Sequence, residues 1–139
     1  VELNRNSIGT ENVSINKIDF EKRIGVKTVD SLINWSKGVS LERAALVYKY
    51  FDDMQKAISE MHRILKKDGY AVLVVGSNTV LKRKVDTYRL LADLAASLGF
   101  EEVLVLKDDI KGRGMITKRH NSGGLIKDEY VIVLKKGIH

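Results

Sequence analysis

The 139-residue chain has the length of one ordinary domain and is too short for two. Its 24 Lys and Arg against 18 Asp and Glu give a formal net charge of +6, which favours polyanionic partners without requiring them. The absence of cysteine excludes disulfides, thiol nucleophiles and Cys-ligated zinc, and no apolar run approaches the roughly 18 residues of a membrane span, so we expect a soluble protein of the cytoplasm with no membrane partner.

Residues 1–39 are expected to form an irregular arm followed by a short helix. Residues 1–26 mix Asn, Ser, Gly and charged residues without a sustained period. The stretch TVDSLINWSKG then predicts a short helix with Thr28 as its N-cap and Gly38 at its end. Trp35 in this helix is expected to anchor a core or an interface and not to stack on a base.

The strongest helical pattern begins at Ser40 and continues to the sequence KKDGY, because apolar residues recur there at spacings of three and four. Gly69 follows as the residue best able to adopt a left-handed stop. His62 lies between an apolar and a charged neighbour. It is expected to face solvent or a partner helix and to play no catalytic role.

YAVLVVG, residues 70–76, is apolar throughout, which predicts a central parallel strand covered by helices on both faces. Asn78 follows the carboxyl end of this strand, where open α/β sheets bind ligands, so it is a candidate for the edge of a substrate pocket. The alternative is an ordinary turn. Lys82, Arg83 and Lys84 either extend a basic face or form a solvated charge run.

The last third of the chain predicts one helix and two strands. The helix lies within VDTYRLLADLAASLGF, with Asp86 or Thr87 as its cap and Gly99 at its end. EEVLVLK and EYVIVLKK predict two strands that pair antiparallel. The order helix, strand, helix, strand, long loop, strand indicates a layered α/β domain.

A basic, glycine-containing segment, DDIKGRGMITKRHNSGG, separates these two strands. It far exceeds the about two to five residues of ordinary hairpin loops, and loops of this length tend to be functional or disordered. Its side chains can contact phosphates, although a solvated hairpin tip is the alternative. The candidate nucleic-acid-binding residues are Lys111, Arg113, Lys118, Arg119, His120 and Asn121.

No residue is assigned to catalysis or to metal binding. The 3 histidines lack metal-ligand spacing, and no serine has a nucleophile-elbow pattern. Asp52 and Asp53 are adjacent on a helix and therefore point to different faces, so they are not expected to converge. Asp108 and Asp109 are expected to begin the loop.

MQKAISEMHRILKKDGYAVLVVGSN and the final EYVIVLKK resemble the carboxy-terminal half of S-adenosylmethionine-dependent methyltransferases that modify amino groups of DNA or RNA bases. The resemblance covers roughly residues 40–136. It implies a partial Rossmann-like methyltransferase sheet with flanking helices, in which the last strand lies antiparallel between its two predecessors. The matching residues are Arg63, Ile64, Leu65, Lys66, Gly69 and residues 70–75.

The resemblance also shows which parts of such an enzyme are missing. The glycine-rich cofactor turn is not found, and without proline there is no Pro-Pro-Tyr loop. Residues 40–139 are therefore expected to be the carboxy-terminal half of a methyltransferase-like domain, inactive alone. It would use S-adenosylmethionine only together with the missing amino-terminal half.

The implied partners are DNA, with RNA second, and the missing half or a partner subunit. If the domain is half a sheet, strand 70–75 has an unpaired edge, which also predicts a homodimer as an alternative. A stand-alone nucleic-acid-binding or regulatory module, a tRNA or rRNA methyltransferase fragment and a small-molecule methyltransferase fragment are the competing interpretations.

Overall fold

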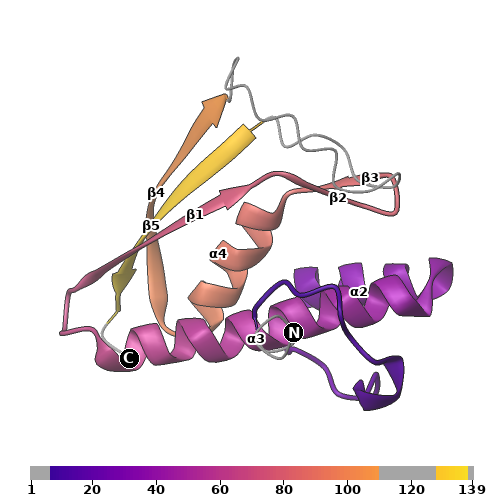
Figure 1. Ribbon diagram of the computed structural model, residues 1–139. Coiled ribbons are helices and arrows are strands. Elements are labelled where there is room, and N and C mark those ends of the chain that lie inside the picture. Colours follow the sequence, from indigo (N-terminus) through magenta and orange to yellow (C-terminus); the bar gives the residue numbers. More distant parts are fainter. Residues whose placement is uncertain (1–6, 110–127, 138–139) are drawn as a thin grey trace. The chain divides into compact units, whose positions relative to one another are not determined.

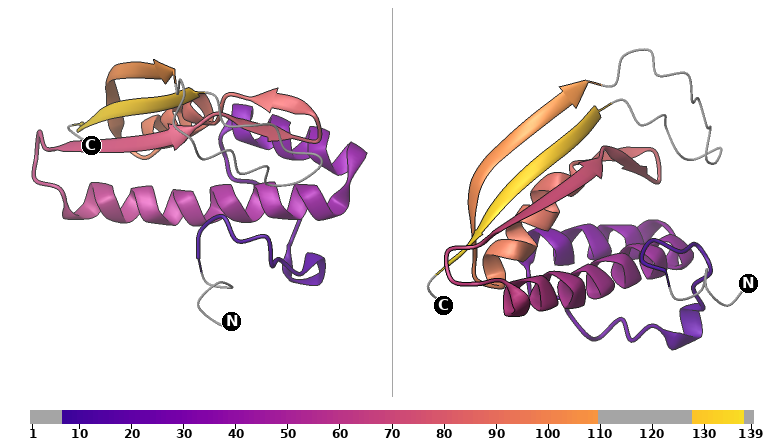
Figure 2. Two further views of the ribbon diagram at one scale, coloured as in Figure 1. Left: turned by 45° about the horizontal axis from the view of Figure 1, so that its top comes forward. Right: turned by 60° about the vertical axis from the view of Figure 1, so that its left-hand side comes forward.

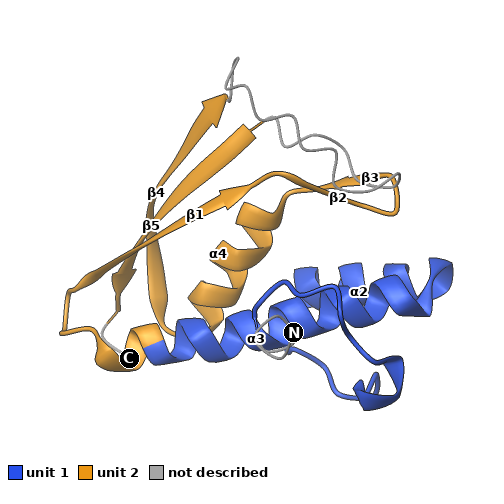
Figure 3. Cartoon of the chain, in the orientation of Figure 1, with its two compact units in different colours: residues 1–60 blue, residues 61–139 orange. Residues whose placement is uncertain are grey.

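The computed structural model describes residues 7–109 and 128–137, which form a mixed α/β structure (Figure 1). No helix within these residues is both long and apolar enough to cross a membrane. The chain divides into two compact units, residues 1–60 and 61–139 (Figure 3). The elements are η1 (Ile15–Lys17), α2 (Lys27–Val39), α3 (Leu41–Ile64), β1 (Tyr70–Gly76), β2 (Asn78–Val80), β3 (Arg83–Val85), α4 (Thr87–Ser97), β4 (Phe100–Asp109) and β5 (Asp128–Lys136).

The first unit contains α2 and most of α3, which run side by side (Figure 2). The predicted short helix is confirmed as α2, but both of its expected ends are wrong. The N-cap is Val26 and not Thr28, and the helix continues through Gly38. A buried serine on its inner face, Ser36, is satisfied locally because its hydroxyl donates to the carbonyl of Leu32 at 2.8 Å.

Asp30 holds the segment that enters α2. Its carboxylate accepts the backbone N–H groups of Ile24 at 2.9 Å and Gly25 at 3.0 Å, so it fixes the chain entering α2. Gln55 on α3 donates its side-chain amide to the carbonyl of Ile24 at 3.0 Å. Side chains of both helices therefore anchor the segment that precedes α2.

The long helix is confirmed as α3, and the Ser40 hydroxyl accepts the N–H of Arg43 at 3.4 Å at its start. The expected left-handed stop at Gly69 is wrong, because Asp68 adopts the positive φ of 62°. Gly69 is required for a different reason. A Cβ at this position would lie 2.8 Å from the carbonyl oxygen of Lys66.

The second unit is built on a three-stranded sheet of order β1-β5-β4 (Figure 2). β5 is antiparallel to both neighbours, which confirms the expected pairing of the last two strands and the position of the last strand between its predecessors. Val133 marks the register, since it lies opposite Val72 of β1 and Leu104 of β4. Because both outer strands run antiparallel to β5, they share one direction.

One face of the sheet forms the core of this unit against α4, which connects β1 to β4. Ile132 and Leu134 of β5 are 0% and 1% exposed, and Leu91 and Leu94 of α4 are both 0% exposed. The predicted helix is confirmed in α4. It begins after Asp86, and Gly99 follows with φ of 97°.

The opposite face of the sheet is apolar and uncovered, and we call it the open face. On β1 its members Tyr70, Val72 and Val74 are 57%, 56% and 60% exposed. The prediction that strand 70–76 is central, parallel and covered on both faces is therefore wrong. Among the described residues it is an edge strand, its one neighbour is antiparallel, and no element covers its second face. The register places Tyr70, Val72, Val74, Val131, Val133, Leu104 and Leu106 on the open face.

Sequence reasoning missed the small antiparallel hairpin of β2 and β3. Each of its strands has 3 residues, too few for an alternating pattern to be recognised. The turn is formed by Leu81 and Lys82, whose φ angles of 50° and 64° are both positive, as in a type I′ turn. Asn-Gly is the usual sequence for this turn, so Leu-Lys is a strained choice.

Replacing Leu81 with Asn and Lys82 with Gly should increase the free energy of unfolding by about 1 kcal/mol, because relief of the left-handed strain exceeds the added flexibility of the unfolded glycine. Urea unfolding followed by circular dichroism measures the change. Lys84→Gly in the adjacent strand is the control and should destabilise. A lower urea midpoint for the turn variant would contradict this interpretation of the turn.

Candidate nucleic-acid interface

The six candidate loop residues stay predictions, because Lys111, Arg113, Lys118, Arg119, His120 and Asn121 lie outside the described residues. The structure does describe the two points at which their segment joins the sheet. Asp109 ends β4, Asp128 begins β5, and the two lie opposite each other. Residues 110–127 contain Lys and Arg but neither Asp nor Glu. A uniformly basic segment is therefore attached at one defined end of the sheet.

This loop end of the sheet is defined by Gly76, Asp109 and Asp128. Gly76 lies opposite Glu129, which also lies opposite Asp108. The carboxyl ends of β1 and β4 and the start of β5 therefore coincide. In open, mostly parallel α/β sheets ligands bind beyond the carboxyl ends of the strands. Among the described strands both pairings are antiparallel, so ligand binding at this end stays a prediction.

Four carboxylates line the loop end in two opposed pairs, Asp108 with Glu129 and Asp109 with Asp128. Like charges in this arrangement repel each other. Lys107 offsets the repulsion, because its ammonium lies 3.5 Å from Asp109 and 3.8 Å from Asp128. The carboxylates of Asp128 and then Asp109 raise the pKa of Lys107. The expectation that Asp108 and Asp109 begin the loop is wrong, since both complete β4 through pairing with β5.

Asn78 lies at the start of β2, directly beyond the loop end, and its side chain is exposed. Its amide oxygen accepts the N–H of Thr79 at 2.8 Å, a local bond typical of turns. The preceding Ser77 donates its N–H to the carbonyl of Asp128 at 2.9 Å, which ties this connection to β5. The position agrees with the sequence expectation, whereas contact with a substrate stays a prediction.

The charge run in the hairpin, Lys82, Arg83 and Lys84, is exposed. Lys84 lies opposite Thr79, and Arg83 lies opposite Val80. Because successive strand residues point to opposite faces, the side chains of Arg83 and Lys84 diverge. The hairpin therefore adds positive charge next to the loop end without focusing it on one point.

A stacked tyrosine pair near the loop end was not foreseen from the sequence. The rings of Tyr88 on α4 and Tyr130 on β5 have centroids 3.9 Å apart and an interplanar angle of 13°. Tyr130 lies opposite Val75 and Lys107 in the sheet. The stack links the start of α4 to the start of β5.

His62 does not face solvent or a partner helix, so that expectation is wrong. Its ring contacts Phe100, the first residue of β4, edge to face at 5.1 Å and 89°. Its Nε2 atom is buried and has no hydrogen-bond partner within the described residues. The contact is a packing contact, and the helical spacing of apolar residues in α3 gave no sign of it.

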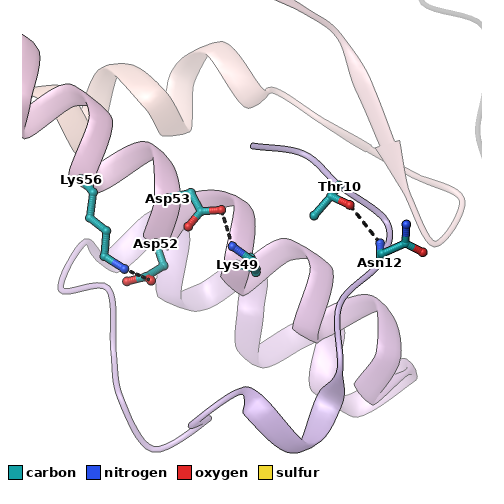
Figure 4. A network of polar contacts seen from close by, with 6 residues as sticks. All are labelled: Thr10, Asn12, Lys49, Asp52, Asp53 and Lys56. Atoms are coloured by element: carbon teal, nitrogen blue, oxygen red, sulfur yellow. Dashed lines mark hydrogen bonds and ion pairs between the residues drawn. The ribbon is translucent and has the colours of Figure 1, made fainter. Parts of the chain in front are cut away.

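The paired carboxylates of α3 do not converge, as expected (Figure 4). Asp52 bonds Lys56 at 2.9 Å and Asp53 bonds Lys49 at 2.6 Å, so each pairs with a lysine one helical turn away. In the same view, Asn12 donates its backbone N–H to the Thr10 hydroxyl at 3.2 Å. Within residues 7–109 and 128–137, no three His, Asp or Glu side chains are placed to hold a metal ion.

The described side chains of the loop end are charged or polar. Lys107 pairs with Asp109 and Asp128, and the Asn78 amide oxygen accepts the N–H of Thr79. The Arg89 guanidinium is engaged by Glu102, and that hydrogen bond raises the pKa of Arg89. The Arg89–Glu102 pair lies near the start of β4, at the other end of that strand from Asp109. Binding of a polyanion by residues 110–127 stays a prediction. In comparisons with known proteins, no family model, no curated protein and no solved structure matches this chain.

Proposed function

We propose that the chain is the carboxy-terminal part of an S-adenosylmethionine-dependent methyltransferase acting on an amino group of a nucleic-acid base, with DNA favoured. The observation that carries this proposal is the strand order β1-β5-β4, with β5 antiparallel to both neighbours. The resemblance implied this insertion of the last strand. β1 and β4 share a direction and are joined through α4, as in a Rossmann-like sheet.

The unpaired edge of β1 gives further support. Its sequence is apolar on both faces, which suits a strand within a larger sheet, yet one face and one edge are uncovered among the described residues. A sheet that continues beyond β1 would explain both features. In the proposed enzyme, that continuation supplies the S-adenosylmethionine site.

The proposed role of this chain is to position the substrate. Amino methylation depends on holding the amine in line with the methyl donor, and a basic segment at the carboxyl ends of the strands can hold the phosphates on either side of the target base. Asn78 would lie at the edge of the pocket that receives the base. The contacts assigned to the loop cations would fix register and orientation, not base identity.

A stand-alone nucleic-acid-binding module is the second candidate. The observation that favours it is the loop end itself, where a segment whose charged residues are all basic is attached beside the ion pairs of Lys107 with Asp109 and Asp128. A tRNA or rRNA methyltransferase fragment would share the strand order and differ in polymer preference. A small-molecule methyltransferase fragment would have no affinity for polyanions.

We expect the chain by itself to bind duplex DNA and to bind no S-adenosylmethionine. Fluorescence anisotropy with duplex DNA, single-stranded DNA and structured RNA measures the polymer preference, and calorimetric titration in the same buffer measures cofactor binding. Duplex binding should weaken steeply between low and physiological salt. Heat from S-adenosylmethionine would contradict the assignment of its site to another part of the enzyme. Tighter binding to structured RNA would favour an RNA substrate, and absence of all nucleic-acid affinity would refute the proposed substrate class.

A further inference from the structure

The two outer edges of the sheet differ in how they are protected. β4 has charged residues near both ends and a register shift between Glu102 and Leu104, which are features that keep an exposed edge from pairing with another chain. β1 reads YAVLVVG and has no charge, no proline and no bulge. The sequence of β4 therefore suits a permanent edge, whereas that of β1 suits a strand with a second neighbour.

The hydrogen bonds at the ends of β1 show which backbone groups face its free edge. Ser77 donates to Asp128 at 2.9 Å, and Lys136 donates to Gly69 at 2.8 Å, so both opposed pairs are bonded across β1 and β5. In an antiparallel ladder, bonded and non-bonded pairs alternate. The residues between them that bond to β5 are Ala71, Leu73 and Val75, and those directing N–H and C=O groups to the free edge are Tyr70, Val72, Val74 and Gly76.

We propose that a second copy of this chain pairs antiparallel with β1 through this free edge, with the two-fold axis passing at Leu73. In that register Tyr70 lies opposite Gly76 of the other copy, and Val72 lies opposite Val74 of the other copy. In this register, the residues whose N–H and C=O groups point to the free edge of one copy lie opposite residues of the same kind in the other copy, as an antiparallel ladder requires. The result is one continuous six-stranded sheet, since each copy contributes three strands.

The side chains along this seam are self-complementary. Val72 and Val74 form apolar cross-strand pairs, and the Tyr70 ring lies beside Gly76, a combination that compensates for glycine in a strand. β1 contributes no charge, so the two-fold axis brings no like charges together. Lys135, opposite Tyr70 in the register, is already paired with Asp68 at 3.4 Å. This inference goes beyond the proposed function: it concerns the chain when no other polypeptide supplies the neighbouring strand, and the two occupants compete for one edge.

Residue-resolved amide hydrogen exchange over a concentration series tests the pairing, with sedimentation velocity on the same samples. We expect a dimer at high concentration, in which the amides of Val72 and Val74 exchange at least about tenfold more slowly than after dilution to monomer. The amides of Leu73 and Val75 bond to β5 and serve as an internal control, since their protection should not depend on dimerisation. A monomer at every concentration, or a dimer without slowed exchange at Val72 and Val74, would overturn the proposal.

Two variants separate edge pairing from packing of open faces. Val72→Pro removes an outward N–H and no bond to β5, so it should abolish the dimer while the amide of Ile132 stays protected. Leu106→Lys places a charge on the open face, two strands from the seam, and should leave the dimer intact. The opposite pattern would show face-to-face packing and refute edge pairing. If Val72→Pro does not fold, the hydrogen-exchange data on the unaltered chain still test edge pairing. No readout involves nucleic acid or S-adenosylmethionine, so the outcome is independent of the proposed function.

Discussion

Replacing Arg113, Lys118 and Arg119 together with alanine should reduce the salt slope of duplex DNA binding by about 2.7, which corresponds to three lost phosphate contacts at about 0.9 each. The reason is counterion release, because each cation that contacts a phosphate displaces a condensed counterion from the DNA. Affinity at low salt should fall by roughly 100-fold. Anisotropy titrations at four or five salt concentrations give the slope directly.

The control for this experiment changes the net charge equally at another place. Lys17, Lys22 and Arg23 are exposed in the first unit, and replacing all of them with alanine removes the same charge. This triple variant should keep the slope of the unaltered chain. An equal reduction in both variants would indicate general attraction by net charge. An unchanged slope in the loop variant would indicate that the loop cations are neutralised within the protein, for which Asp108, Asp109, Asp128 and Glu129 are the available carboxylates.

The elements that the sequence predicted well are those with long, regular patterns. The apolar stripe of α3 spans many turns, and the strands β4 and β5 are long and well bounded, so local pattern sufficed. The caps were harder. Thr28 has the right chemistry for a cap, but α2 begins at Lys27 after Val26 with no side-chain cap, and the carboxylate of Asp30 accepts N–H groups of Ile24 and Gly25 before the helix. Whether a side-chain oxygen near the start of a helix bonds the helix or the preceding segment depends on the path of that segment, which helix propensity does not encode.

The prediction that β1 is covered on both faces was wrong. An apolar run indicates which environment suits a strand, but it does not indicate whether another element is present to cover that strand. The same run that predicts a buried strand produces the open face, because α4 packs on one side of the sheet and no described element covers the other. The stack of Tyr88 on Tyr130 and the contact of His62 with Phe100 join residues far apart in sequence. No spacing rule would have found these pairs, because each depends on how a helix settles against a strand.

The charge of the candidate site and the strands to which it is attached could be predicted from the sequence, but the arrangement of the residues around it could not. The basic segment and the acidic residues at both of its ends are evident in the sequence, and the structure adds that these acidic residues lie opposite one another across β4 and β5. The opposed acidic pairs could not be predicted, because the two members of each pair are separated in the sequence by residues 110–127. Their presence makes the salt slope the decisive measurement, since it separates cations that face DNA from cations held by these carboxylates.

Ile132→Ala should lower the free energy of unfolding by about 3 kcal/mol, a large part of the roughly 5–15 kcal/mol typical of whole domains. The Ile132 side chain is 0% exposed on the central strand of the sheet and lies opposite Leu73 and Val105 on the α4 side. Truncation leaves a cavity that rigid strands on both sides cannot close. Denaturant unfolding followed by circular dichroism measures the loss.

Val133→Ala is the matched comparison, because Val133 is the next residue of the same strand and faces the open side of the sheet. With only partial burial there, its truncation should cost less than about 1 kcal/mol in a monomer. Equal losses for the two variants would mean that both faces of β5 are covered, and the open face would then be occupied in solution. A large loss for Ile132→Ala with a small loss for Val133→Ala would place the core of this unit on the α4 side, because the one additional carbon that Ile132→Ala removes accounts for only about 0.8 kcal/mol.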